Sequence, residues 1–235
     1  MTVFSTNSEK HLIINDERRR RLCDSPAEKI GRGTDYRIRH PQDVRQLQLV
    51  RFRRYESLSS RGCGLWRIQS GYVRSLTWDI TGELVSLGFW TVGDVVGLSA
   101  AASCQKNMAH THPYEAQCLT AVAAEYLGSH RSFSREDLLT QLDQSNRLLR
   151  ISHCQRTETR LLLFMCWIAE RFGKPTPEGY QINIKLTHQE MAESISTTRV
   201  TVSRLIKVLE RKGKIQWTAH KKQVNRIALN ECHAA

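Results

Sequence analysis

Long apolar runs are missing from this 235-residue chain. The longest is Leu161–Ala169, nine residues, whereas a helix that crosses a bilayer needs about 20. The N-terminal region carries charges but lacks the apolar core, ending in small residues, that a signal peptide has. With 40% apolar and 25% charged residues, the composition is typical of a soluble globular protein. We therefore expect a cytoplasmic protein with no membrane partner.

Motifs for disulfides, metals and catalysis are missing as well. Cys104, His110, His112 and Cys118 share one segment, but their spacing matches no standard zinc pattern, so we expect no metal site. A nucleophile elbow, a phosphate loop and an HExxH motif are all absent, so we expect no enzyme. The cysteines are odd in number and form no CxxC pair, which predicts reduced thiols that act as small apolar fillers. The seven are Cys23, Cys63, Cys104, Cys118, Cys154, Cys166 and Cys232.

Positive charge is in excess, with a formal net charge of +12. Residues 1–40 carry three more basic than acidic side chains, residues 41–130 carry one more, and residues 131–235 carry eight more. Such a basic half is expected of a phosphate-binding surface, although a merely solvated basic face is the alternative. The run Arg18–Arg21 lies in a polar segment that we expect to be a mobile arm. A contact of this run with DNA is left open.

The segment Leu186–Leu209 has the pattern of a helix-turn-helix. Thr187 and Glu190 are spaced as a capping box for a first helix, and Thr198 is a candidate cap for a second. In the second helix, helical spacing predicts an inner face made of Val202, Leu205, Ile206 and Leu209. The opposite face suits a DNA major groove, because arginine binds guanine while lysine and hydroxyls hold phosphates. That face carries Arg199, Val200, Ser203, Arg204 and Lys207.

Residues 44–128 contain short β-rich segments separated by glycines or polar turns. This spacing predicts an antiparallel sandwich or barrel, with Thr81-Gly82 as a hairpin turn between two strands. The predicted strands are Gln46–Tyr55, Leu65–Gln69, Tyr72–Trp78, Leu84–Trp90, Tyr114–Leu119 and Ala123–Leu127.

A helical pattern runs from Ser134 to Phe172, with a break near Thr157. Ser134 is a candidate cap, and the second helix, Glu158–Phe172, is apolar on several sides, as expected in a core. The first helix has a heptad seam, widened by Leu148 and Ile151, that predicts pairing with a second copy. Packing on its own β-domain alone is the alternative. The seam consists of Leu138, Leu142, Ser145, Leu149 and Ser152.

The remaining C-terminal segments predict a wing beside the helix-turn-helix. Gly173–Gly179 is expected to be a loop, and Tyr180–Lys185 a short strand. Lys214–Thr218 and Val224–Leu229 are predicted as the two wing strands. The residues His220-Lys221-Lys222 would then lie at the tip of the wing.

Several of these motifs resemble the Crp/Fnr family of transcription regulators. Leu65–Arg74, Thr81-Gly82-Glu83 and Gly93–Gly97 resemble its double-stranded β-helix (jelly-roll) effector domain. Arg171-Phe172-Gly173, Leu186–Ala192 and Thr198–Leu205 resemble its winged helix, most of all in the cyanobacterial nitrogen-control (global nitrogen regulator) branch. The resemblance covers roughly residues 62–230.

The resemblance implies an α+β fold in four parts. These are a mobile arm (1–40), a β-roll, cyclic-nucleotide-binding-like effector domain (41–130), a dimerisation helix (131–156) and a winged helix-turn-helix DNA-binding domain (157–235). It also implies a homodimer that binds a palindromic promoter site in double-stranded DNA, with half-sites about 10 base pairs apart. RNA polymerase is an implied further partner.

Individual DNA contacts are also implied by the resemblance. Arg199 would bind guanine, Arg204 a base or a phosphate, and Val200 a thymine methyl, which favours sites of the GTA…TAC type. Ser196 stands where the family usually has glycine, which costs about 1 kcal/mol if φ is positive there. Phosphate contacts are implied for Thr187, His188, Gln189, Thr198, Thr201, Lys221 and Lys222.

The sequence does not identify the effector ligand. The cyclic-nucleotide branch holds its phosphate with an arginine, and no arginine lies between Arg74 and Arg131, so a cyclic nucleotide is not expected. The nitrogen-control branch senses 2-oxoglutarate, also with arginine. That ligand stays open, although the segment offers only Lys106, His110 and His112.

The alternative to a DNA-binding regulator is a protein of a different functional class. The chain could be a sensory or interaction module whose winged helix is not used for specific DNA reading. An acidic or apolar outer face on the second helix would favour it. The observed Arg199, Arg204 and Lys207 count against it.

Overall fold

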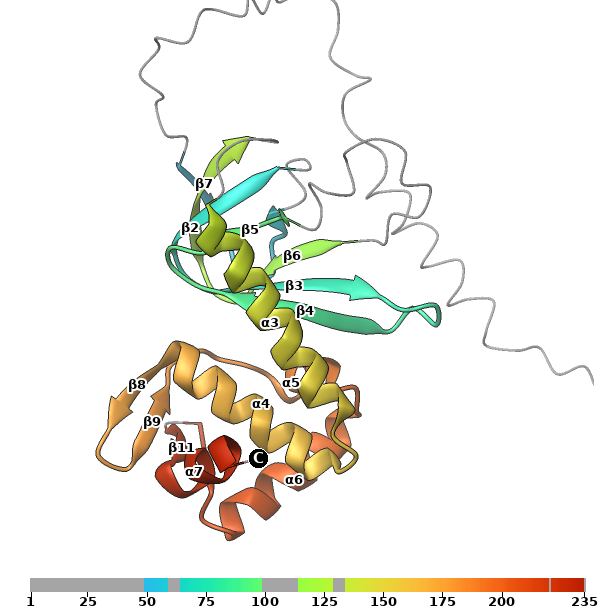
Figure 1. Cartoon of the computed structure of the whole chain (residues 1–235), viewed down its shortest axis with the longest axis vertical. Helices are drawn as coiled ribbons and strands as arrows, with labels where there is room; N and C mark the ends of the chain where they lie inside the picture. Colours follow the sequence, from blue (N-terminus) through green and yellow to red (C-terminus); the bar gives the residue numbers. More distant parts are fainter. Residues whose placement is uncertain (1–48, 59–63, 99–113, 129–133, 220, 235) are drawn as a thin grey trace, which may run out of the picture.

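The computed structural model describes residues 49–58, 64–98, 114–128, 134–219 and 221–234. The predicted arm 1–40 lies outside these residues, as do Cys104, His110 and His112. A β-domain lies next to a C-terminal unit of helices and short strands, and a long helix, α3, runs along the β-domain and ends at the C-terminal unit (Figure 1). The predicted α+β architecture is thereby confirmed.

Seven antiparallel strands form the described part of the β-domain. One sheet has the order β1 (Leu49–Phe52), β7 (Val122–Gly128), β2 (Leu65–Ser70) and β5 (Val95–Val96). The other has the order β4 (Leu84–Trp90), β3 (Val73–Trp78) and β6 (Glu115–Cys118). Each strand contributes to a core that includes Phe52, Trp66 and Trp90. The six predicted strands are present with different ends, although the start of the first, Gln46, lies outside the described residues. Strand β5, only two residues long, was not predicted.

The predicted hairpin turn joins β3 and β4. Asp79 Oδ1 accepts hydrogen bonds from the backbone N–H groups of Thr81 and Glu83, at 2.8 and 2.9 Å. Gly82 has φ +86°, a conformation that glycine adopts without steric cost. The turn residues therefore determine where β3 ends and β4 begins.

The end of β4 is hydrogen-bonded to two helices, α3 (Arg135–His153) and α4 (Thr157–Phe172). The buried side chain of Gln144 on α3 accepts a hydrogen bond from the backbone N–H of Phe89, with an O···N distance of 2.6 Å. Arg171 on α4 donates to the carbonyl of the same Phe89, at 3.2 Å, and pairs with Asp94 at 2.7 Å. One strand end thus contacts both helices.

Helix α3 begins at a capping box in which Ser134 and Asp137 exchange hydrogen bonds, and its two faces differ. The predicted seam residues Leu138, Leu142 and Leu149 are 48%, 56% and 56% exposed. Ile151 was predicted to widen this stripe, and that prediction was wrong. It is buried in the core around α4, and Leu148 packs against the same core. The apolar residues of α3 therefore form two stripes, one buried in its own chain and one exposed.

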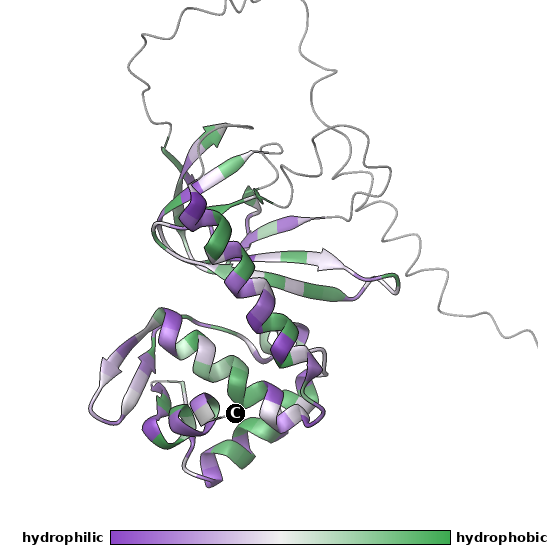
Figure 2. Ribbon diagram, in the orientation of Figure 1, coloured by the Kyte–Doolittle hydropathy of each residue, from purple (hydrophilic) through white to green (hydrophobic). Residues whose placement is uncertain are grey.

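The C-terminal unit is built around α4, whose middle is hydrophobic in Figure 2. Helices α5 (His188–Ser194), α6 (Arg199–Arg211) and α7 (Arg226–Ala234) share one core with it. A four-stranded sheet completes the unit, in the order β10 (Ile215–Trp217), β11 (Lys222–Asn225), β9 (Gly179–Ile182) and β8 (Gly173–Thr176).

Two predictions for this unit were wrong. The segment from Gly173 was expected to be a loop, but it begins with β8, an edge strand in which Pro175 is tolerated because one side of an edge strand needs no hydrogen-bond donor. The second wing strand was predicted to continue to Leu229, but β11 ends at Asn225 and α7 follows. Ala228 and Leu229 are buried in the core around α4, which favours the helix.

The C-terminal unit docks on the β-domain through an apolar core shared by Phe89 and α4 and through polar contacts beside it. Arg74 on β3 and Glu193 on α5 form an ion pair at 2.7 Å, with side chains only 5% and 12% exposed. Arg74 also donates to Gln117, at 3.0 Å. Beside this pair the buried hydroxyl oxygens of Ser86 and Ser194 are 3.0 Å apart. These contacts position the first helix of the helix-turn-helix relative to the β-domain.

We predict that Glu193→Ala lowers the free energy of unfolding by about 3 kcal/mol, because it leaves the Arg74 guanidinium buried without its counter-charge. Urea unfolding of the full chain measures this. Asp143→Ala is the matched control, since it removes an exposed ion pair with Arg147 and should cost less than about 0.5 kcal/mol. Equal losses in the two variants would contradict the prediction.

Candidate nucleic-acid interface

Helices α5 and α6 form the predicted helix-turn-helix, and local side chains determine their ends. Thr187 and Glu190 form the predicted capping box at the start of α5. Thr198 caps α6 by accepting a hydrogen bond from the backbone N–H of Thr201, at 3.2 Å. Ser196 in the turn has φ +51°. It therefore occupies a left-handed conformation that glycine would adopt with less strain.

The two sides of α6 are strongly different. Val202, Ile206 and Leu209 are buried and Leu205 packs against the same core, as predicted. On the outer side Arg199, Arg204 and Lys207 are exposed, and Val200 is 69% exposed. The predicted reading face is thus accessible to a large partner.

Hydrogen bonds hold part of this outer surface in place. The Nδ1 atom of His188 lies 2.7 Å from Ser203 Oγ, and Ser203 donates to the carbonyl of Arg199 at 3.0 Å. The hydroxyl oxygens of Thr198 and Thr201 are 2.9 Å apart. The predicted residues therefore form two hydrogen-bonded pairs at the start of α6, His188 with Ser203 and Thr198 with Thr201. Gln189 instead donates to Glu193 on its own helix, at 3.0 Å.

A cluster of positively charged side chains extends from the start of α6 towards the β-domain. The pKa of His188 is lowered by burial and by the charges of Arg199 and Lys222. The pKa of Lys222 is lowered by burial and by the charges of Lys185 and Arg54. These shifts show that the cationic groups lie close enough to repel one another. Such a concentration of charge suits an anionic partner.

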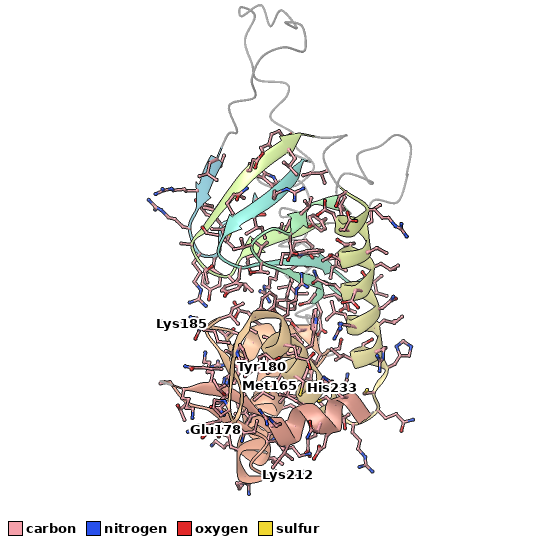
Figure 3. The ribbon with its side chains drawn as sticks, turned by 60° about the vertical axis from the view of Figure 1, so that its left-hand side comes forward. Met165, Glu178, Tyr180, Lys185, Lys212 and His233 are labelled. Carbon is pink, nitrogen blue, oxygen red and sulfur yellow. The ribbon has the colours of Figure 1, made fainter. Side chains whose placement is uncertain are left out.

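Two members of this cluster were not predicted. Lys185 is exposed and directly precedes the capping box, so its position beside Leu186 could have identified it. Arg54 comes from the β-domain and donates to the carbonyl of Lys185, at 3.1 Å. Figure 3 shows Lys185 at the level where the C-terminal unit meets the β-domain. Because 131 positions separate Arg54 from Lys185, only the fold reveals this pairing.

The wing contributes the two predicted lysines in different ways. Lys222, in β11, lies 5.1 Å from the ring centroid of Trp217 in β10, which fixes the ammonium group over the aromatic face. Lys221 is paired with Glu178 at 3.5 Å, through largely exposed side chains. An exposed pair of this kind is weak, so Lys221 can exchange its partner for a phosphate at little cost.

The predicted dimer seam lies on α3, away from the DNA-reading surface. Its leucines are exposed, whereas the hydroxyls of Ser145 and Ser152 donate to the carbonyls of Gln141 and Leu149 on the same helix. Arg74, the last arginine before the arginine-free segment, is held by Glu193 and Gln117. No cluster of three or more metal-ligating side chains occurs among the residues that the structure describes. No helix in the described part of the chain is long and apolar enough to cross a membrane.

Comparison with known proteins identifies the family of this chain. Residues 159–231 match the model of the Crp-like helix-turn-helix domain. The chain is 40% identical over 154 residues to the regulatory protein CysR of Synechococcus elongatus, an alignment that covers 64% of this chain and 71% of CysR. The chain belongs to the Crp/Fnr family. It is therefore a transcription regulator with a helix-turn-helix DNA-binding domain, and not an enzyme.

Other Crp/Fnr relatives confirm the predicted branch and fold. The global nitrogen regulator of Synechocystis sp. is 42% identical over 74 residues, 31% of this chain and 33% of that protein, in agreement with the nitrogen-control branch. A Crp/Fnr regulator from Thermus thermophilus has the same fold, with a TM-score of 0.63 over 80% of this chain and 99% of that one, at 21% identity.

We predict that stability falls on acidification in a way that depends on His188. Its pKa is lowered from the ordinary value of 6.5, so below that pH the unfolded chain takes up the proton first. The free energy of unfolding therefore decreases as the pH falls through about 6.5. His188→Gln should weaken this dependence, as measured by urea unfolding at pH 7.5 and 5.5. Gln189→Ala, next along the helix, should leave it unchanged, and an unaltered dependence in His188→Gln would contradict the assignment.

Proposed function

We propose that this regulator binds a palindromic promoter site as a homodimer and reads each half-site with α6. The observation that carries the proposal is the outer face of α6, on which Arg199, Val200 and Arg204 are exposed to solvent. An apolar side chain that is 69% exposed between two arginines suits the floor of a major groove, where thymine methyls and guanine acceptors lie side by side. The resemblance of Thr198–Leu205 to the nitrogen-control branch implies a GTA…TAC type of site.

The surrounding cations give the proposed interface its affinity. Lys185, Lys222 and Arg54 lie beside the reading helix and would contact phosphates on the flanks of the half-site. These contacts are independent of sequence. Thr187, Gln189, Thr198, Thr201, Ser203, Lys207 and Lys221 are proposed to complete the backbone contacts, with RNA polymerase as a further partner at the promoter.

We predict that Arg199→Ala lowers affinity for a GTA…TAC palindrome roughly 10- to 100-fold and has little effect on scrambled DNA, because it removes a bidentate contact with guanine. Lys222→Ala should weaken binding to both duplexes by similar factors, because it removes only a phosphate contact. Fluorescence anisotropy titrations at fixed salt measure all six affinities, those of the unmodified chain and of the two variants for each duplex. Equal affinity of the unmodified chain for palindromic and scrambled DNA would instead favour the interaction module.

The exposed stripe of α3 supports the proposed dimer. Leu138, Leu139, Leu142 and Leu149 are each about half exposed, and a monomer would leave this apolar surface in water. The heptad spacing of Leu138, Leu142 and Leu149 suits pairing with the same helix of a second copy. Two reading helices related by twofold symmetry then match a palindromic site.

We predict that Leu142→Arg converts the dimer to a monomer, because it places two like charges in an apolar seam. Light scattering after size-exclusion chromatography measures the mass. Asp143→Arg is the matched control, because it introduces the same side chain about 100° further around α3. A dimer that survives Leu142→Arg unchanged would place the interface elsewhere.

A further inference from the structure

Two cysteines at the centre of the C-terminal unit face each other. Cys166 on α4 is buried, and Cys232 on α7 is partly buried. Their sulfur atoms are 2.7 Å apart, so the sulfurs need to approach by less than about 1 Å to reach the length of a disulfide bond. The two helices therefore already hold the thiols in position for a bond between them.

Polar contacts on both sides of Cys232 hold this arrangement in place. Glu231, the preceding residue, forms an ion pair with Lys214 beside β10. His233, the following residue, forms a hydrogen bond with Glu170 on α4. Because both neighbours are tied to different elements, the last turn of α7 cannot easily swing away from Cys166. Neither contact involves a residue of the proposed DNA interface.

Both thiols also line a cavity of about 90 Å³, with Arg147, Arg150, Trp167 and His233 among its other walls. A cavity of this kind needs only about 10–15 Å³ to admit a water molecule, so a small hydroperoxide fits. Arg147 and Arg150 are themselves exposed, so the cavity opens to solvent in the single chain. A small oxidant can therefore reach the sulfur atoms.

We propose that Cys166 and Cys232 form a redox-sensitive dithiol that a small hydroperoxide oxidises to an intramolecular disulfide. The Cys232 thiolate attacks a peroxide oxygen, the O–O bond breaks, and a sulfenic acid and one water result. The Cys166 sulfur then attacks Cys232 Sγ, the S–O bond breaks, and the second water leaves as the S–S bond forms. Two thiols and one hydrogen peroxide thus give one disulfide and two waters.

The electrostatics give each cysteine a different part in this reaction. The pKa of Cys232 is lowered by its hydrogen bond with Cys166, and Lys214 adds to this effect. The pKa of Cys166 is raised by the same hydrogen bond and by burial. Cys232 is also the less buried of the two thiols, so we assign it the attack on the oxidant as the thiolate, and Cys166 resolves the sulfenic acid.

The bond would enclose the DNA-reading part of the chain. The two cysteines are 66 positions apart, and α5, α6 and both wing strands lie between them. A cross-link around a loop of this length stabilises the folded state chiefly by restricting the unfolded chain. Oxidation therefore cross-links the two ends of the segment that contains α5, α6 and the wing strands, and a reductant removes the cross-link.

The test treats the full-length reduced chain with a small excess of hydrogen peroxide, blocks the remaining thiols with N-ethylmaleimide and digests with trypsin. We expect a linked pair formed by the peptide Leu161–Arg171 and the peptide that begins at Ile227, lighter by two hydrogens than the sum of the two. We also expect Tm to rise by at least about 5 °C, and dithiothreitol to reverse both changes.

Cys232→Ala should abolish the linked peptides and the rise in Tm, while Cys154→Ala, at the end of α3, should behave like the unmodified chain. Cys232 is partly exposed, so its substitution is expected to fold, and unchanged DNA affinity of reduced Cys232→Ala separates this test from that of the proposed function. Recovery of Cys166 and Cys232 as alkylated thiols would overturn the proposal. So would a sulfinic acid at Cys232 beside an alkylated Cys166, or a bond from Cys232 to another cysteine.

Discussion

The buried pair of Arg74 and Glu193 restricts how the DNA-binding unit is oriented, together with the aromatic contacts that Phe89 makes with α4. Burying two charges costs several kcal/mol of desolvation, and only close pairing with further hydrogen bonds offsets that cost. Gln117 supplies one such bond. A pair of this kind contributes little net stability, but it penalises every arrangement in which the partners separate without reaching water. The first helix of the helix-turn-helix is thereby held at one position on β3, and the reading helix α6 follows because the two helices share a core.

Local signals explain why the helix-turn-helix could be predicted almost residue by residue. The Thr187–Glu190 capping box, the Thr198 cap and the spacing of Val202, Ile206 and Leu209 all depend on residues within one turn of each other. The positive φ of Ser196 was raised only as a condition, because the family that the chain resembles usually has glycine at this position. The predicted strands of the β-domain also rest on local alternation, and only their ends and the short β5 differed.

The errors arose where tertiary contacts decide the local structure. Ile151 and Leu148 fit a heptad seam as well as a core stripe, and only the packing of α4 shows that they face inwards. Ala228 and Leu229 fit a strand as well as a helix until α4 is present to bury them. Arg54 beside Lys185, Arg74 beside Glu193 and Cys166 beside Cys232 are all contacts between distant segments. No spacing in a single sequence reveals such contacts.

The backbone of Phe89 joins elements with different tasks. Its N–H group is bound by Gln144 in the middle of α3, and its carbonyl is bound by Arg171 near the end of α4. The first helix carries the exposed leucine stripe and the second forms the floor of the DNA-reading unit. A shift of Phe89 along its strand would therefore act on both helices at once. Coordination between the proposed subunit pairing and the proposed DNA reading then requires no long chain of intermediate residues.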